Sequence, residues 1–246
     1  VNLGGVIISN ATLHNFEEIK KKNIQIGDIV EIQRAGDVIP QVIKVFKKNN
    51  KKNYLIEPPD QCPACGSKTF KEEDEAVLRC INTYGCPAQK ISQIVHFISK
   101  KALNIDGFGE KQVKQFYELG LINNVSDIFY LKNKRQKLQN LEGWGKLSVE
   151  NLINAIENSK NISLNKFIFS LGIRFIGEIN SEILALEFKN IETFISSSEN
   201  TDILSNIDGL GPKAISSIKN FFSFNKNKLL LKKLYEILNV EETKIK

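Results

Sequence analysis

Four cysteines constrain how this chain can fold more than any other feature, because they stand close together and are the only cysteines present. They form a C-x2-C pair and a C-x5-C pair, at Cys62, Cys65, Cys80 and Cys86. Two close pairs flanking a short excursion suit a tetrahedral zinc ion, since each pair can bind as a knuckle while the excursion folds back. Four cysteine ligands leave no position for water. The spacing therefore predicts a structural zinc ion rather than a catalytic one.

The alternative explanation is a pair of disulfides in a secreted protein. We recognise no signal peptide, and four clustered cysteines with none elsewhere fit a reducing cytoplasm. With 246 residues, 41% of them hydrophobic and 25% charged, the chain is long enough for two or more globular domains. No apolar run approaches the roughly 18 residues that a membrane span needs. The net charge of +6 permits a polyanionic partner without requiring one.

Residues 1–57 alternate short apolar runs with turn signals. We expect strands over residues 6–8, 29–34 and 38–45, the last carrying a proline that belongs on an edge or at a bulge. Asn15 is placed to cap a short helix, with Glu18 in the capping-box position. A small Greek-key barrel of the OB type fits this pattern. An SH3-like barrel or a plain meander remains open, because periodicity alone does not separate them.

After residue 89 the apolar residues follow a helical period, and a Gly-hydrophobic-Gly turn recurs between the expected helices. The copies lie at 105–111, 141–146, 173–178 and 207–213, and the glycines at 109, 145, 177 and 211 are spaced by 36, 32 and 34 residues. Such an internal repeat predicts four helix-hairpin-helix elements. The third copy is weaker, because Phe175 stands where the others have their first glycine.

Paired glycines let a backbone turn tightly and approach a partner, since neither presents a Cβ. The apolar residue between them can anchor the hairpin, while backbone N–H groups at the following helix N-terminus point at an anion. Three copies add a lysine just after the second glycine. We therefore expect sequence-independent phosphate contacts on duplex DNA, at Gly107, Gly109, Lys111, Gly143, Gly145, Lys146, Gly177, Gly209, Gly211 and Lys213. The plainer explanation is that these turns only join packed helices.

The remaining segments complete a multidomain α+β fold. Residues 58–89 form the expected zinc finger and residues 90–246 an all-α helix-hairpin-helix domain. Within that domain, residues 221–238 read as one closing helix, and residues 241–246 as a frayed end.

Several short motifs carry a resemblance to a known family. They are ATLHN at 11–15, GD at 27–28, RAGDVIP at 34–40, and the cysteine cluster closed by CPAQ at 86–89. Together they resemble the C-terminal portion of bacterial NAD-dependent DNA ligases, over essentially the whole chain. The resemblance implies that the OB domain begins upstream of Val1, so that the barrel is incomplete here. The family usually also carries a BRCT module, and we expect none within this chain.

The resemblance also implies roles for residues that would otherwise pass as ordinary. It implies that Arg34 reaches the phosphate backbone of DNA and that Val38 and Ile39 pack near the minor groove. It likewise raises His14 to a DNA-binding role, although a lone histidine is usually a packed or surface residue.

The resemblance implies nick sealing in replication and repair, with NAD and magnesium used by the whole enzyme. That chemistry starts at the lysine of a K-x-D-G motif, and this sequence has none: its two x-x-D-G sites begin with Asn104 and Asn206. We therefore expect no catalytic or cofactor-binding residue in this chain beyond the zinc ligands. The chain should clamp nicked duplex DNA beside an N-terminal adenylation portion, as a monomer in the bacterial cytoplasm associated with the nucleoid.

Two other functions stay open. One is a non-catalytic helix-hairpin-helix scaffold that recruits partners to nicked or branched DNA. RAGDVIP argues against it, because a generic scaffold does not need that element. The other is a zinc-stabilised protein-interaction domain, which explains the cysteines but leaves four phosphate-ready hairpins unused.

Overall fold

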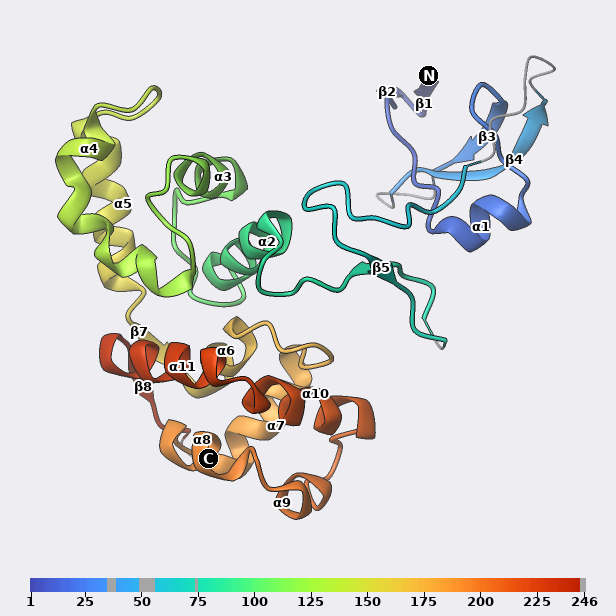
Figure 1. Ribbon diagram of the computed structural model, residues 1–246. Helices are drawn as coiled ribbons and strands as arrows, with labels where there is room; N and C mark the ends of the chain where they lie inside the picture. The colour runs from blue at the N-terminus through green and yellow to red at the C-terminus, as the bar shows by residue number, and fades with distance from the viewer. Residues whose placement is uncertain (35–38, 49–55, 74, 244–246) are drawn as a thin grey trace. The chain divides into compact units, whose positions relative to one another are not determined.

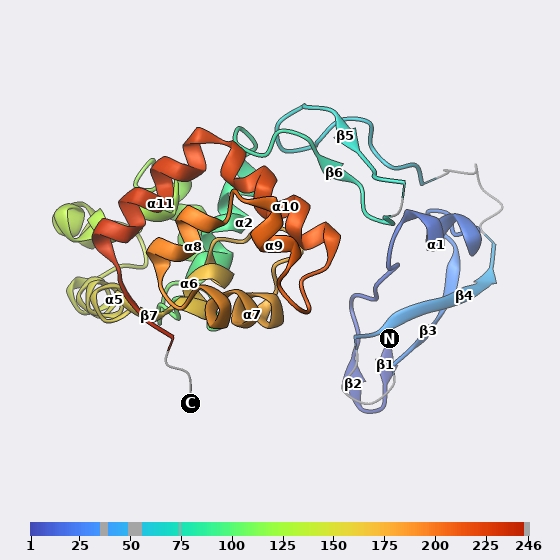
Figure 2. The same ribbon diagram turned by 90° about the horizontal axis from the view of Figure 1, so that it is seen from below.

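The computed structural model describes residues 1–34, 39–48, 56–73 and 75–243. The chain divides into two compact units, residues 1–87 and residues 88–246, whose elements are drawn in Figure 1 and, from a second direction, in Figure 2. The predicted boundaries after residues 57 and 89 stay predictions.

The first unit begins with short strands around one helix. β1 (Asn2–Leu3) pairs antiparallel with β2 (Val6–Ile7), and β3 (Ile29–Gln33) pairs antiparallel with β4 (Gln41–Lys47). The expected alternation along β3 is present, since Val30 and Ile32 are half-buried between exposed neighbours. Together with Ala11, Leu13 and other apolar residues they pack against a small core of Ile19, Ile24 and Val42.

Helix α1 (Phe16–Lys21) begins where its capping residue predicts. Asn15 Oδ1 accepts the Glu18 backbone N–H at 2.9 Å, which satisfies one of the unpaired donors of the first turn. The Glu18 carboxylate does not complete a capping box. It pairs instead with Lys22 Nζ at 3.3 Å.

The cysteine segment follows in the same unit. Its regular structure is limited to β5 (Thr69–Phe70) and β6 (Arg79–Cys80), which pair antiparallel. Lys71, just after β5, forms an ion pair with Glu17 of α1, which links this segment to the β-rich part.

The second unit is mainly helical. Its first half contains α2 (Pro87–Ile98), α3 (Glu110–Glu118), the 3-10 helix η1 (Val125–Lys134), α4 (Arg135–Gln139) and α5 (Lys146–Asn158). Its second half contains α6 (Leu164–Ser170), α7 (Glu178–Phe188), α8 (Ile191–Ser197), α9 (Thr201–Ser205), α10 (Pro212–Ser223) and α11 (Asn225–Ile237). The two halves share one continuous hydrophobic core, whose largest fully buried side chains are Phe97, Phe116, Phe167, Phe194 and Phe222.

Three expectations for this unit were wrong in detail. It is not purely α-helical, because β7 (Asn161–Ser163) and β8 (Asn239–Glu241) form a parallel pair, adjacent in Figure 1. Residues 241–243 are not frayed, since the Thr243 N–H donates to the Lys189 carbonyl at 2.7 Å. The span 221–238 is not one helix, because the extended backbone of Phe224 separates α10 from α11.

Candidate metal centre and nucleic-acid interface

The four cysteines lie in the first unit as thiols rather than disulfides, and their sulfur atoms all lie within 4.8 Å of one another. The Sγ atoms of Cys62 and Cys86 are 3.9 Å apart, and those of Cys65 and Cys80 are 3.5 Å apart. A tetrahedral ion with metal–sulfur bonds of about 2.3 Å places its ligands about 3.8 Å from one another. The sulfur positions therefore fit a zinc ion at their centre.

Two tight turns place these sulfurs. At the first, Gly66 has a φ of +70° and its N–H donates to the Cys62 carbonyl at 2.8 Å. At the second, the Gly85 N–H donates to Asn82 Oδ1 at 2.9 Å. A Cβ at Gly85 would collide with the Asn82 side chain. The structure thus gives each glycine a physical reason at its turn.

Two of the thiols have opposite pKa shifts. Hydrogen bonds from Ser67, first through its side chain and then through its backbone, lower the pKa of Cys65 to about 6. The Asn82 N–H lowers the pKa of Cys80, but burial and the neighbouring Cys65 and Cys62 sulfurs raise it to about 11. One thiolate thus opposes the formation of a second beside it. A bound cation removes that opposition, which is the chemistry expected of a metal-binding thiol set.

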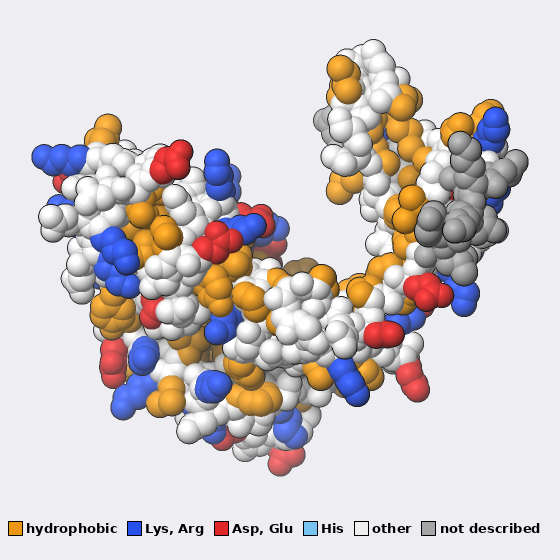
Figure 3. Space-filling model, turned by 45° about the horizontal axis from the view of Figure 1, so that its top comes forward, with side chains coloured by type: hydrophobic (Ala, Val, Ile, Leu, Met, Phe, Trp, Pro, Cys, Tyr) orange, Lys and Arg blue, Asp and Glu red, His pale blue; other side chains and the backbone are white. Residues whose placement is uncertain are grey.

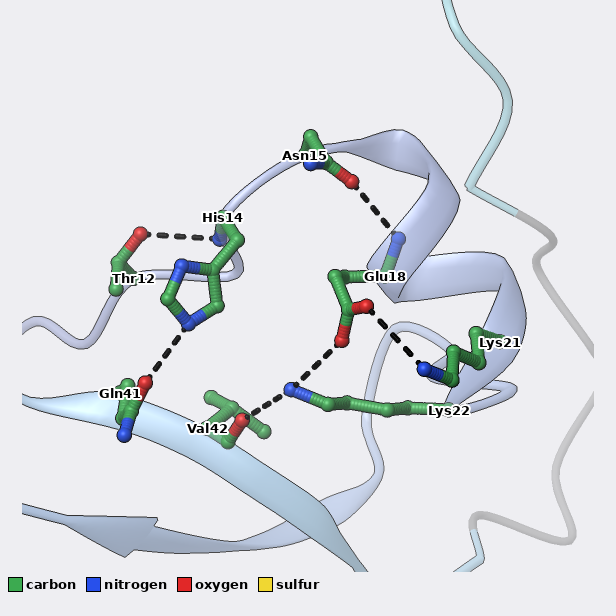
Figure 4. A network of polar contacts seen from close by, with 8 residues as sticks. All are labelled: Thr12, His14, Asn15, Glu18, Lys21, Lys22, Gln41 and Val42. Carbon is green, nitrogen blue, oxygen red and sulfur yellow. Dashed lines mark hydrogen bonds and ion pairs between the residues drawn. The ribbon is translucent and has the colours of Figure 1, made fainter. Parts of the chain in front are cut away.

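The sequence motif at 11–15 lies beside the end of the motif at 34–40. The Thr12 N–H donates to the Pro40 carbonyl at 2.8 Å, and the Val42 N–H donates to the Thr12 carbonyl at 3.1 Å. The His14 side chain then reaches β4, where its Nε2 donates to Gln41 Oε1 at 2.8 Å (Figure 4). His14 is exposed and its backbone is left-handed, with a φ of +62°.

Lys22, at the C-terminal end of α1, fixes that helix against β4. Its Nζ donates to the Val42 carbonyl at 2.8 Å while it pairs with the Glu18 carboxylate. The Lys22 hydrogen bond is the largest of the effects that lower the pKa of Glu18. Figure 4 shows this network, including the second lysine, Lys21, on the same carboxylate. Sequence reasoning missed Lys22 and Gln41, which carry no motif signal of their own.

The other predicted contacts of this unit are placed in part. Arg34 is half-buried at the end of β3. Ile39 is 71% exposed just before β4. Val38 lies outside the described residues.

The four predicted hairpins share one backbone geometry. We call residues 105–109, 141–145, 173–177 and 207–211 hairpins 1 to 4. Each closes a turn in which the fourth residue donates its N–H to the carbonyl of the first, between 3.0 and 3.4 Å. The third residue is left-handed in every case, at Gly107, Gly143, Phe175 and Gly209. The turn that the repeat predicted is therefore present four times, including the copy without a first glycine.

The second glycine of each hairpin caps the next helix. Gly109, Gly145, Gly177 and Gly211 are the N-cap residues of α3, α5, α7 and α10. Their φ values lie between −125° and −72°, a range that any L-residue adopts. A Cβ at Gly145, Gly177 or Gly211 would meet no atom within 4 Å. Neither conformation nor internal packing explains why these positions hold glycine.

The residue between the two hairpin positions anchors each turn, as expected. Phe108, Ile176 and Leu210 are buried, and Trp144 is half-buried against the core. Lys111, Lys146 and Lys213 are exposed in the first turns of α3, α5 and α10. Pro212 occupies the start of α10, where its missing N–H costs no hydrogen bond.

Two hairpins carry a further contact that sequence reasoning missed. Gln112 Oε1 accepts the Gly109 N–H at 3.2 Å, and Ser148 Oγ accepts the Gly145 N–H at 2.8 Å. Both are the third residue of their helix, the capping-box position, and this spacing was an available signal. The same position in hairpin 4 holds alanine, which offers no such acceptor.

Figure 3 shows one face of the molecule, and charge alone does not mark an interface on it. On the face shown in Figure 3, lysine and arginine side chains are scattered over the helical part, with acidic side chains between them. The hairpins are distinguished instead by their backbone geometry and by the lysines beside it.

Comparison with known families matches three of these parts. Residues 1–54 match the NAD-dependent DNA ligase OB-fold domain, and residues 61–88 match the NAD-dependent DNA ligase C4 zinc finger domain. The chain belongs to the NAD-dependent DNA ligase family. Residues 166–231, which contain hairpins 3 and 4, match the helix-hairpin-helix motif. The predicted OB-fold, zinc-finger and helix-hairpin-helix parts of this ligase chain are thereby confirmed.

Curated proteins similar to this chain are named DNA ligase. The chain is 47% identical to the DNA ligase of Rickettsia bellii (strain OSU 85-389) and 46% identical to those of Rickettsia canadensis (strain McKiel) and Rickettsia conorii (strain ATCC VR-613 / Malish 7). Each comparison covers 99% of this chain and 37% of the relative's length. Among the described residues of this ligase chain, no helix is both long and apolar enough to cross a membrane.

Proposed function

We propose that this chain is the DNA-binding and clamping portion of an NAD-dependent DNA ligase. It binds the backbone of nicked duplex DNA without sequence specificity and helps to align the ends of the nick. The observation that supports this most is the N-cap glycine of hairpins 2, 3 and 4, where a Cβ would meet nothing within the chain. An external backbone that approaches the helix N-terminus gives a reason for glycine at these positions.

Phosphate is the group that such an approach would bring. Backbone N–H groups at a helix N-terminus favour an anion, and a lysine in the first turn adds charge to the same contact. In the second unit the residues that bind DNA on this proposal are Gly107, Gly109, Lys111, Gly143, Gly145, Lys146, Gly177, Gly209, Gly211 and Lys213. In the first unit they are His14, Arg34, Val38 and Ile39.

The zinc ion belongs to the fold rather than to the chemistry. Cys62, Cys65, Cys80 and Cys86 would hold one ion, and with four sulfur ligands no coordination position is left for substrate. Its contribution would be to hold together the turn before β5, the end of β6 and the turn that leads into α2.

In the whole ligase, on this proposal, sealing proceeds through enzyme adenylation by NAD, transfer of AMP to the 5′-phosphate of the nick, and attack by the 3′-hydroxyl. NAD and magnesium are used outside this chain, in an N-terminal adenylation portion that is its partner. The present chain would act in the last two steps by positioning, as a monomer in the bacterial cytoplasm associated with the nucleoid.

The test compares two variants of α10. Lys213→Ala removes a charge beside hairpin 4, whereas Lys219→Ala removes one six residues further along the same helix, about 9 Å away. Affinity for a nicked duplex should fall for Lys213→Ala and stay near the parent value for Lys219→Ala. Equal effects would assign Lys213 to general electrostatic attraction and argue against a hairpin contact.

A second experiment separates the ligase portion from a free-standing scaffold. A pre-adenylated N-terminal portion is mixed with this chain and a nicked duplex. Some sealing should be restored, although poorly, because the link that makes the encounter intramolecular is cut. A scaffold would bind the duplex and restore none. The chain alone, incubated with NAD and magnesium, should not acquire AMP, since asparagine at positions 104 and 206 cannot replace the K-x-D-G lysine.

A further inference from the structure

Hairpin 3 differs from the other three at its tip. The third position of its turn holds Phe175 with a φ of +62°, where the others hold glycine with φ values of +72°, +80° and +84°. A bulky side chain in the left-handed region is strained. Such strain persists where the surrounding structure imposes it, and strained residues of this kind cluster at functional sites. Glycine would relieve it here at no cost in turn geometry.

The Phe175 side chain is exposed and held in place. It is 39% exposed, and the Arg174 guanidinium carbon lies 4.6 Å from the centre of its ring. The Asn180 side chain donates to the Phe175 carbonyl at 2.7 Å, which ties the tip to the first turn of α7. A ring presented in a fixed position loses little conformational freedom when it makes a contact.

The surroundings of this ring suit an apolar surface better than a phosphate. Two residues after the N-cap glycine, hairpins 1 and 4 have lysine, whereas hairpin 3 has Ile179, which is 75% exposed. The residue between, Glu178, is acidic and pairs with Lys101 at 2.5 Å, so the first turn of α7 adds no lysine of its own, and the cation at this tip is Arg174, which lies against the Phe175 ring. Hairpin 3 thus exposes an aromatic and an aliphatic side chain where hairpins 1 and 4 expose backbone and a lysine.

Hairpin 3 is also fixed next to a hairpin of the other kind. A Cβ at Gly209 of hairpin 4 would lie 3.0 Å from Ile183 Cδ1 of α7, so the turn of hairpin 4 packs against the helix that hairpin 3 begins. If hairpin 4 contacts a phosphate, the tip of hairpin 3 lies near the same duplex. The surface of a duplex that suits an aromatic ring is the C–H face of the sugars and the base edges within a groove.

We propose that Phe175 contacts this sugar and base surface of duplex DNA, an apolar contact made beside the backbone approach that Gly177 permits. The inference rests on the proposed function and deepens it. Because the contact is apolar, it adds affinity that does not depend on salt, whereas each phosphate contact changes the slope of log affinity against log salt by about −0.9. The two kinds of hairpin can therefore be told apart by one titration series.

The experiment measures the affinity of the parent chain and of Phe175→Ala for one duplex at several salt concentrations. The variant should bind about five- to tenfold more weakly at every salt concentration, with an unchanged slope, as expected for loss of one aromatic contact. Phe175→Gly, whose backbone suits the turn better, should have an unfolding midpoint no lower than the parent and should also bind more weakly. If the Phe175→Ala variant folds poorly, Phe175→Gly still tests the contact.

The control is Phe224→Ala. Phe224 is 42% exposed, close to the 39% of Phe175, but lies at the far end of α10 from hairpin 4, and its replacement should leave affinity unchanged. Affinity equal to the parent in both Phe175 variants would overturn the inference, as would a change of about 0.9 in the slope for Phe175→Ala. If the parent itself does not bind duplex in a salt-dependent way, the proposed function fails instead.

Discussion

The indole Nε1 of Trp144 donates a hydrogen bond of 2.9 Å to Oε1 of Gln115. The Nε2 of the same glutamine donates to the Glu142 carbonyl at 3.3 Å, so one side chain of α3 holds both ends of the hairpin 2 tip. The Trp144 ring also lies 5.0 Å from Phe116, which lies 5.5 Å from Phe108. Hairpins 1 and 2 are thus joined by a row of aromatic rings and closed by a hydrogen bond.

Trp144→Phe removes the indole N–H and keeps a ring against Phe116. We expect the free energy of unfolding to fall by about 1 kcal/mol, the usual net value of one such hydrogen bond. Denaturant unfolding measures it. In a double-mutant cycle with Gln115→Ala, the two losses should be less than additive, because they share the bond. Strict additivity would show that Trp144 acts through packing alone.

Removal of one zinc ligand should affect the two units differently. Cys65→Ser should reduce bound zinc from about one ion per chain to well below one and unfold the cysteine segment, because metal binding and folding are linked there. The helical unit has its own core and should keep its far-ultraviolet circular dichroism. Elemental analysis of protein purified without chelators measures the zinc. An absence of zinc from the parent protein would contradict the assignment.

The ion pairs of Glu157 predict how the stability of the folded state changes at acidic pH. Its carboxylate pairs with Lys160 at 2.6 Å and with Lys132 of η1 at 3.3 Å. These lysines, Lys160 first, lower the pKa of Glu157 below its ordinary value of 4.5. The pairs therefore stabilise the folded state fully above about pH 4.5, and this stabilisation is lost as pH falls through the lowered pKa.

Glu157→Gln should accordingly reduce stability at pH 7, by less than about 1 kcal/mol for pairs this exposed. The difference between parent and variant should shrink as the pH falls below 4.5. Unfolding midpoints measured from pH 7 to pH 3 test this. A difference that grows on acidification would mean that the sign is wrong.

The two glycines of hairpin 4 should respond differently to alanine. Gly209 is left-handed, and its added Cβ would press on Ile183. Gly209→Ala should therefore lower the free energy of unfolding by about 1–2 kcal/mol or more. Gly211 is extended and open, so Gly211→Ala should cost less than about 1 kcal/mol and still weaken duplex binding. Equal stability losses would remove the distinction between a turn glycine and a contact glycine.

Much of this architecture could be predicted because its signals are local. The cysteine spacing predicted one cluster of four sulfurs, and the glycine repeat predicted four turns, including the one at Phe175. The left-handed conformation of Phe175 was not evident from its residue type. It follows from the fold, which imposes the same turn at all four hairpins.

What could not be predicted depends on contacts between distant segments. The strands β7 and β8 have three residues each, too few for a period, and pair across the length of the helical unit. The break at Phe224 falls inside a continuous apolar pattern, so periodicity alone joined α10 to α11. The contacts of Gln41 with His14 and of Lys22 with Val42 likewise depend on the fold that brings β4 beside the ATLHN segment.

The most direct test of the account is the salt dependence of duplex binding by the chain and by a triple variant, Lys111→Ala, Lys146→Ala and Lys213→Ala. Each phosphate contact contributes about −0.9 to the slope of log affinity against log salt, so the triple variant should have a slope about 2.7 shallower than the parent. Its helical content should be unchanged, because all three lysines are exposed. A parent slope near zero, or the same slope in both proteins, would contradict phosphate binding at the hairpins.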